Sequence, residues 1–482
     1  MLHILTSIDT YLYYPVLLII LALAAIFFTI RTRFVQVRMF GEACRCIAEK
    51  PQEEGALSSF QALMVSTASR VGTGNIVGVS TAICLGGAGA VFWMWLLALL
   101  GAASAFIETT LAQIYKRKDP KTGEYFGGPA YYIEHALHNR VVAVIFIIFL
   151  ILTYGFGFQL LCSYNVQTTF QTYSFYDTSV TPWVVGAVLA FFVGLVLFGG
   201  GKRIAHVSSA LVPFMGIMYV VASLVVIFAH VRFIPAMFAW IFRDAFNFRA
   251  IGSGIAGSCM VYGMKRGLYS NEAGVGSAPN AAASADVSHP VKQGLVAVLS
   301  VYIDTLLLCT ATALMCLSSG VVPTAANSGA PYVQQSLSSV FGRFGPIFIT
   351  VSMLLFAFTT LIGNLFYVDN AVTYLNHKKE PSRRAMNWIH LACVIVVFLG
   401  AVTPMDAAWA AADISMGGMA IINIPCCIIL GSKAIAALKD YERQKKAGHD
   451  PHFYASNIKI NKDDLECWLE TPPEAVSEHE NF

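Results

Sequence analysis

Long apolar runs, separated by short polar loops, dominate the pattern of hydrophobic and polar positions along the chain. A helix needs about 20 mostly apolar residues to cross a bilayer. We therefore expect about eleven transmembrane helices, near residues 14–30, 57–85, 90–115, 141–164, 182–200, 206–230, 250–285, 291–318, 345–376, 386–402 and 406–432. Two shorter amphipathic stretches, at 127–138 and 332–341, lie between these spans and predict surface helices.

The composition indicates a polytopic, all-α membrane protein. Of the 482 residues, 56% are hydrophobic and only 12% are charged, whereas soluble domains carry about 25% charged residues. The sequence contains no His-Glu-x-x-His motif and no phosphate-binding loop of the Gly-x-x-x-x-Gly-Lys type. These observations argue against a membrane enzyme and a nucleotide-driven pump, and we expect no cofactor.

The basic residues predict the orientation of the chain. When the loop at 31–56 is placed inside, most of the 31 lysines and arginines fall on the inner side, and four arginines fall outside. The positive-inside rule then predicts an external N-terminus and a cytoplasmic C-terminus, in the plasma (inner) membrane. From about residue 440 onward the chain is polar, so we expect a solvated, partly disordered tail.

Two of the apolar runs are interrupted at their centres. The run at 57–85 contains the string SRVGTGN (69–75), and the run at 250–285 contains NEAGVGS (271–277). Glycine weakens a helix interior by about 1 kcal/mol relative to alanine, so the Gly-x-Gly pairs predict broken helices. Glycine pairs also serve close helix packing, but paired interrupted helices indicate a transporter site.

The two interrupted helices run in opposite directions across the predicted membrane. Each opens a set of five helices, which predicts an inverted 5+5 repeat preceded by one extra N-terminal helix. We expect an N-terminal helix and cytoplasmic loop at 1–56, the first repeat at 57–248 and the second at 249–435. A cytoplasmic tail at 436–482 completes the predicted organisation.

The first interruption has the chemistry to hold a zwitterion and a cation. Backbone N–H groups at the start of the outer half-helix attract a carboxylate, so Gly72, Thr73 and Gly74 are candidate ligands. Carbonyl groups from Ala68 to Val71, at the end of the inner half-helix, suit Na+ or an ammonium group. The remaining candidate substrate ligands are Asn75 in the first interruption and Gly274, Gly276 and Ser277 in the second.

Some of these side chains have two possible roles. Asn75 is either a cation ligand or the cap of the outer half-helix. The adjacent Thr359 and Thr360 either bind a cation between them or bond to their own helix. Trp409 lies near a predicted helix end, where tryptophans usually form an interfacial belt.

Ionisable residues inside predicted spans are functional candidates. They are Glu108, Asp304, Asp369, Asp413 and, beside the second interruption, Glu272. Glu272 and Asp304 are candidate coupling or structural residues. We also expect charges such as those of Arg70 and Glu272 to pair across the interface of the two repeats, with partners that the sequence does not identify. Lys265 and Arg266 suggest that the outer half of their helix is short or meets water.

Several strings resemble the alanine or glycine:cation symporter family, also called sodium:alanine symporters. They are VGTGNIVGV (71–79), RGLYSNEAGVGSAP (266–279), HPVKQG (289–294) and IDT (303–305). The resemblance extends over about 30–435. It implies the leucine-transporter-like 5+5 fold, coupling to Na+ or H+, and small neutral amino acids as substrates.

The same resemblance implies roles for individual residues. The carbonyls of Ala68 and Val71 and the hydroxyls of Thr359 and Thr360 would hold Na+. Trp409 would lie beside the substrate. The sequence thus predicts a secondary symporter for alanine or glycine with Na+. The alternative is a proton-coupled transporter of another small zwitterionic or anionic substrate, using Glu272 or Asp304.

Overall fold

The computed structural model describes residues 12–53, 55–120, 122–199, 201–247, 259–376 and 381–469, which are mostly helical. Within these ranges, seven helices are long and apolar enough to cross a membrane, and shorter apolar helices lie at Leu18–Arg31, Gly74–Gly86 and Thr181–Leu197. The all-α, multi-pass architecture is as predicted. The number of eleven spans is not established by these lengths.

The first half of the chain follows the predicted order of helices, with a small β-hairpin after the third predicted transmembrane helix. Its elements are η1 (Leu12–Leu17), α2 (Leu18–Arg31), α3 (Val35–Arg38), α4 (Phe40–Ile47), α5 (Ser59–Arg70), η2 (Gly74–Gly78), α6 (Val79–Gly86), α7 (Ala90–Ile114), β1 (Arg117–Lys118), β2 (Tyr125–Phe126), α8 (Pro129–Ala136), α9 (Arg140–Leu150), η3 (Ile151–Gly157), α10 (Phe158–Thr168), η4 (Thr169–Thr172), α11 (Thr181–Leu197), α12 (Gly201–Ala229), η5 (Val231–Phe233) and α13 (Ile234–Ala245).

The second half begins inside the second interrupted helix. Its elements are α15 (Cys259–Asn271), α16 (Ala278–Ala282), α17 (Pro290–Val301), η7 (Tyr302–Cys309), α18 (Thr310–Ser318), η8 (Ala325–Asn327), α19 (Ala330–Phe341), α20 (Phe344–Leu375), α21 (Arg383–Gly400), α22 (Met405–Lys446), η9 (Ala455–Asn457) and η10 (Lys462–Asp464). The predicted start of this helix at 250–258, and the repeat boundary at 248–249, lie outside the described residues.

Local sequence explains where several helices begin. Ser58 and Gln61 form a reciprocal capping box at the start of α5. Asn139 and Ser382 cap α9 and α21 through their side chains. His289 accepts a hydrogen bond from the Val291 N–H and is followed by proline at the first position of α17.

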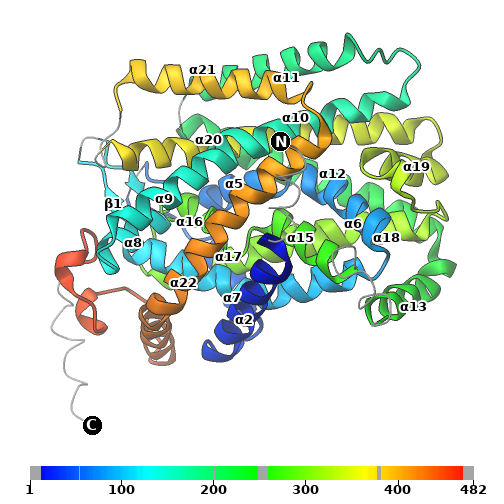
Figure 1. The fold of residues 1–482 in the computed structure, drawn as a ribbon. Helices are drawn as coiled ribbons and strands as arrows, with labels where there is room; N and C mark the ends of the chain where they lie inside the picture. Colours follow the sequence, from blue (N-terminus) through cyan, green and yellow to red (C-terminus); the bar gives the residue numbers. More distant parts are fainter. Residues whose placement is uncertain are drawn as a thin grey trace.

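The two repeats are interleaved around the interrupted helices (Figure 1). Helix α5 packs against α12 and α20, while α15 packs against α7, so each interrupted helix contacts the other repeat. The residues of both interruptions are buried. On the periphery, α11, α12 and α21 expose large apolar side chains such as Phe191, Phe214 and Trp388, as expected of helices that face lipid.

The C-terminal region differs from its prediction. Helix α22 continues beyond the predicted end at 432 to Lys446. The segment that follows, as far as residue 469, folds back beside β1 and α8 (red in Figure 1). It is polar in sequence, but Phe453, Ala455 and Leu465 are buried. The expectation of a solvated tail is therefore wrong for this segment, because a few apolar side chains anchor it.

Candidate functional site

The first interruption lies between α5 and η2, at the predicted glycines. Helix α5 ends at Arg70, and Val71 has non-helical dihedral angles (φ −75°, ψ 85°). The Gly72 N–H donates to Asn75 Oδ1 at 2.9 Å. Asn75 lies inside η2, and its amide oxygen accepts the N–H of a residue that precedes this helix, so the bond bridges the interruption. It is not a helix cap, because the N-cap residue of η2 is Thr73, which makes no side-chain capping bond.

The second interruption lies between α15 and α16. Glu272, Gly274 and Gly276 have positive φ angles of 52°, 87° and 89°. Glycine adopts this region without steric cost, whereas a glutamate there is strained. The prediction of a broken helix is confirmed at both Gly-x-Gly strings.

A buried ion pair joins the two interruptions. Arg70 Nε lies 4.0 Å from Glu272 Oε2, and both side chains are completely buried. The Ser277 hydroxyl donates to the same carboxylate oxygen at 2.6 Å. Among the described residues, the guanidinium nitrogens of Arg70 have no hydrogen-bond partner, so charge holds this pair. The expected pairing of charges across the repeat interface is confirmed.

A second carboxylate secures the second interruption from the side of α7. Glu108 Oε1 accepts a hydrogen bond from the Gly274 N–H at 3.2 Å, and Glu108 Oε2 accepts one from Asn423 Nδ2 at 2.8 Å. Asn423, on α22, also donates to the Gly274 carbonyl at 2.9 Å. Sequence analysis missed Asn423, whose only signal is an amide side chain within an apolar helix.

Asp304, in the π-helical segment η7, links the first interruption to α15. Its carboxylate accepts hydrogen bonds from Asn75 Nδ2 at 2.7 Å, from Ser270 Oγ at 2.7 Å and from Thr305 Oγ1 at 2.9 Å. Three donors compensate the desolvation of a buried carboxylate. Asp304 therefore holds Asn75 in position.

The two adjacent threonines of α20 point to different partners. Thr360 Oγ1 donates to the Ala68 carbonyl at 3.0 Å, which brings α20 against the end of α5. The Thr359 hydroxyl instead donates to carbonyls of its own helix, at Leu355 (3.1 Å) and Phe356 (3.0 Å). The structure thus brings Thr360 and Ala68 together and directs Thr359 to its own backbone.

Trp409 lies inside the protein and not in an interfacial belt. It is 6% exposed, and its ring packs edge-on against Tyr269 at 5.0 Å. The Arg266 guanidinium stacks on it at 3.6 Å from the ring centroid. The Asp413 carboxylate binds Lys265 Nζ at 2.9 Å and lies 3.5 Å from Arg266. One carboxylate of α22 therefore lies against both basic residues of α15.

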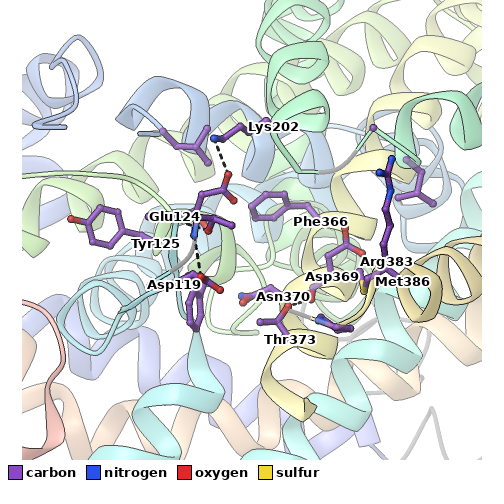
Figure 2. Close-up of a pocket in the computed structure, with 18 of the residues that line it drawn as sticks. Asp119, Glu124, Tyr125, Lys202, Phe366, Asp369, Asn370, Thr373, Arg383 and Met386 are labelled. Atoms are coloured by element: carbon purple, nitrogen blue, oxygen red, sulfur yellow. Dashed lines mark hydrogen bonds and ion pairs between the residues drawn. The ribbon is translucent and has the colours of Figure 1, made fainter. Parts of the chain in front are cut away.

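A cleft of about 730 Å³ lies at the end of the molecule that carries β1 and β2 (Figure 2). Lys202 and Glu124 form an ion pair of 3.0 Å on one wall, and Asp369 and Asn370 of α20 lie opposite. Asp369 binds His390 of α21 at 2.8 Å.

A chain of amide hydrogen bonds links this cleft to the second interruption. Asn370 Nδ2 donates to Asn280 Oδ1 at 2.9 Å. Asn280 Nδ2 donates in turn to the carbonyls of Gly276 and Ser277, at 3.0 and 2.8 Å. Two side-chain amides in series therefore connect the cleft to the second interruption.

Comparison with known proteins identifies the relatives of this chain. A family model described as "Sodium:alanine symporter family" matches residues 1–455. "Probable sodium/glutamine symporter GlnT" of Bacillus subtilis is 40% identical, over 97% of this chain and 96% of its own. "Sodium/alanine symporter AgcS" of Methanococcus maripaludis is 34% identical, over 91% of this chain and 97% of its own.

Solved structures support the same fold. The structure of MhsT in complex with L-phenylalanine matches with a TM-score of 0.53 at 14% sequence identity, over 80% of this chain and 96% of its own. That similarity concerns the fold alone, and it confirms the predicted leucine-transporter-like architecture. The match of nearly the whole sequence shows that the chain belongs to the sodium:alanine symporter family, whose members are transporters and not enzymes.

Proposed function

We propose that the chain imports a small neutral amino acid, alanine or glycine, together with Na+ by alternating access. Membership of the family supports Na+-coupled symport of an amino acid. The identity of the substrate is our inference. The observation that supports it most is the meeting of two broken helices from opposite repeats, joined by Arg70 and Glu272 in a buried centre.

Each broken helix end supplies a different part of the proposed site. The N–H groups of Gly72, Thr73 and Gly74 lie at the start of a helix, where partial positive charge favours a carboxylate. The Gly72 N–H already donates to Asn75 Oδ1, so a carboxylate that uses this group has to replace the Asn75 amide oxygen. In the second interruption, Gly274 and Gly276 bend the chain and Ser277 orients the Glu272 carboxylate.

The aromatic surroundings favour a small substrate. A methyl group added at Gly74 would lie 2.8 Å from the Tyr269 ring, so this ring already fills the space beside the interruption. Trp409 packs on Tyr269 from the other side. A side chain larger than that of alanine would have to displace these rings. We therefore assign Trp409 to the wall of the substrate site.

The Na+ site is proposed at the carbonyls of Ala68 and Val71 with the Thr360 hydroxyl. Na+ prefers oxygen ligands, and Thr360 Oγ1 already contacts the Ala68 carbonyl. Thr359 can join this set only by giving up the bonds to its own helix.

The two threonines provide a matched pair of variants. Thr360→Val removes the hydroxyl that contacts the Ala68 carbonyl. We expect the Na+ concentration for half-maximal uptake to rise about tenfold, because the loss of one charge-assisted contact costs about 1.5 kcal/mol. Thr359→Val removes a hydroxyl bonded to its own helix and should change this value by less than about twofold. Initial uptake rates at varied Na+ measure both. An unchanged Na+ dependence in Thr360→Val would place the cation elsewhere.

A proton-coupled mode is the second candidate. Two buried carboxylates lie at the second interruption: Glu272 pairs with Arg70, and Glu108 accepts the Gly274 N–H. Arg70 carries one positive charge, so one of the two carboxylate charges stays uncompensated, which is unfavourable in a buried site. Binding of a proton at Glu272 or Glu108 would remove this excess negative charge. Asp304, with three hydrogen-bond donors, is better suited to remain ionised.

Uptake into proteoliposomes distinguishes these candidates. The purified full chain is tested with labelled alanine, glycine and glutamine under an imposed Na+ gradient, under a choline substitution and under a pH gradient. We expect Na+-driven accumulation of alanine or glycine. Accumulation of glutamine alone would refute the proposed substrate, and accumulation driven only by the pH gradient would refute Na+ coupling.

The orientation follows from the placement of charge. We propose that the end carrying β1, the cleft and the C-terminal segment faces the cytoplasm, because most lysines and arginines lie there in the predicted topology. The cleft then opens to the cytoplasm, and the Asn370 and Asn280 amides connect it to the second interruption. A fluorescent protein fused after the last residue should fluoresce in the cytoplasm. Activity of an alkaline phosphatase fused at the same position would contradict the proposed orientation.

A further inference from the structure

The segment that follows α22, residues 448–469, is bound to the second repeat through its first half. The Phe453 N–H donates to the Ser288 carbonyl at 2.9 Å, and the Ser288 hydroxyl donates to the Pro451 carbonyl at 2.8 Å. Asp450 pairs with Lys292 at 3.0 Å. These contacts lie directly after α16, the inner half of the second interrupted helix.

The second half of the same segment is bound to the first repeat. Glu466 pairs with Arg117 of β1 at 2.9 Å. Trp468 Nε1 donates to the carbonyl of Gln113, at the end of α7, at 3.0 Å. The segment thus connects the two repeats at the end of the molecule that we assign to the cytoplasm.

Trp468 lies over the seam between the two interrupted helices. Its side chain packs against a small buried cluster of Ala62, Ala285 and Val287. Ala62 belongs to α5, the inner half of the first interrupted helix, and the other two residues follow α16. The same seam is closed by the backbone, since the Asp286 N–H donates to the Leu57 carbonyl at 2.9 Å.

The conformation of Trp468 shows that this position is held by its surroundings. Its φ angle is 71°, a left-handed conformation that a bulky residue adopts only under constraint. Phe453 packs edge-on against the indole at 5.5 Å. Lys116 Nζ lies 4.6 Å from the ring centroid and donates to the Ala285 carbonyl at 3.1 Å. Burial lowers the pKa of Lys116 to about 8.

We propose that residues 448–469 form a strap that holds the cytoplasmic gate closed, with Trp468 as the positioning residue that clamps the seam. The inference rests on the proposed alternating access, in which the cytoplasmic halves of the interrupted helices must separate. Because Trp468 contacts both sides of the seam, it has to leave before they part. Loss of Trp468 therefore shifts the population toward the cytoplasm-open state.

A cysteine at position 284 reports this opening without any substrate. Ser284 is 7% exposed, lines the cytoplasmic cleft and precedes Ala285 in the seam. The full chain with Ser284→Cys is reconstituted, and a membrane-impermeant maleimide is applied from the cytoplasmic side. Mass spectrometry of the peptide containing position 284 separates its labelling from that of the native cysteines.

We expect Trp468→Ala to raise the labelling rate at position 284 about fivefold or more, because the closed population falls. The neighbouring Leu469, 49% exposed, provides the matched control, and Leu469→Ala should stay within about twofold of the parent. A Trp468→Ala chain that melts normally and labels no faster than the Leu469→Ala chain would overturn the strap.

A second variant covers the case in which Trp468→Ala fails to fold. Glu466→Gln removes the ion pair to Arg117, and the Glu466 side chain is 46% exposed, so the fold should tolerate it. We expect a labelling increase in the same direction, and an unchanged rate would overturn the strap. Because the assay contains no amino acid, failure of the proposed substrate would appear in the uptake experiment and not here.

Discussion

Gly72→Ala is expected to abolish Na+-driven uptake. An alanine Cβ at this position would lie 2.1 Å from Thr360 Oγ1, a distance at which one group must move. Thr360 relieves this clash by rotating about χ1, which takes its hydroxyl away from the Ala68 carbonyl. Overpacking of this kind costs about 1–3 kcal/mol, and here the cost falls on the proposed cation site.

Gly78→Ala is the matched control for this variant. Gly78 lies in the same broken helix, and an added Cβ would make an ordinary contact of 3.8 Å with the Tyr269 ring. Uptake should therefore be retained. Gly74→Ala, whose Cβ would lie 2.8 Å from the same ring, should lose alanine binding. If Gly72→Ala keeps normal uptake and Na+ dependence, the first interruption does not bind the cation.

Breaking the ion pair between Arg70 and Glu272 is the second change with a large expected effect. Removal of one partner of a buried pair costs about 3–5 kcal/mol, because the remaining charge stays uncompensated. Arg70→Met leaves the buried Glu272 carboxylate without its guanidinium. We expect Arg70→Met and Glu272→Met each to lower the melting temperature strongly and to eliminate uptake.

The double variant Arg70→Met/Glu272→Met separates stability from transport. It removes both charges, so its melting temperature should recover relative to the single variants, while uptake stays absent. The exposed pair of Lys118 and Glu53, with side chains 37% and 48% exposed, is the control. Lys118→Met should cost no more than about 1 kcal/mol. Uptake by the double variant would show that this pair serves stability alone.

Local sequence patterns predicted the parts of the site that depend on local backbone chemistry. Gly72 and Gly74 interrupt their helix, and Gly274 and Gly276 have the positive φ angles that favour glycine. That Arg70 and Glu272 each need a charged partner was also predictable, because a charge buried in a membrane requires one. Which residues pair with each other is seen only in the structure.

Other features depend on packing between distant segments and carry no local signal. The hydroxyls of Thr359 and Thr360 look equivalent in sequence, and only the approach of α5 to α20 distinguishes them. Asn423 acquires its role because α22 crosses the second interruption. The C-terminal segment is polar overall, and its fold depends on Phe453 and Trp468 meeting at the seam.

The central claim is that Na+ and a small amino acid bind together at the paired interruptions. Its most direct test is a titration of the purified full chain with alanine, followed by thermal melting, in NaCl and in choline chloride. A ligand that binds only the folded state raises the melting temperature, and the rise grows with the logarithm of the ratio of ligand concentration to Kd. We expect alanine to bind the wild-type chain at least about tenfold more tightly in Na+ than in choline. Alanine should not raise the melting temperature of Gly72→Ala. Equal affinity in the two salts, or normal stabilisation of Gly72→Ala, would contradict the account.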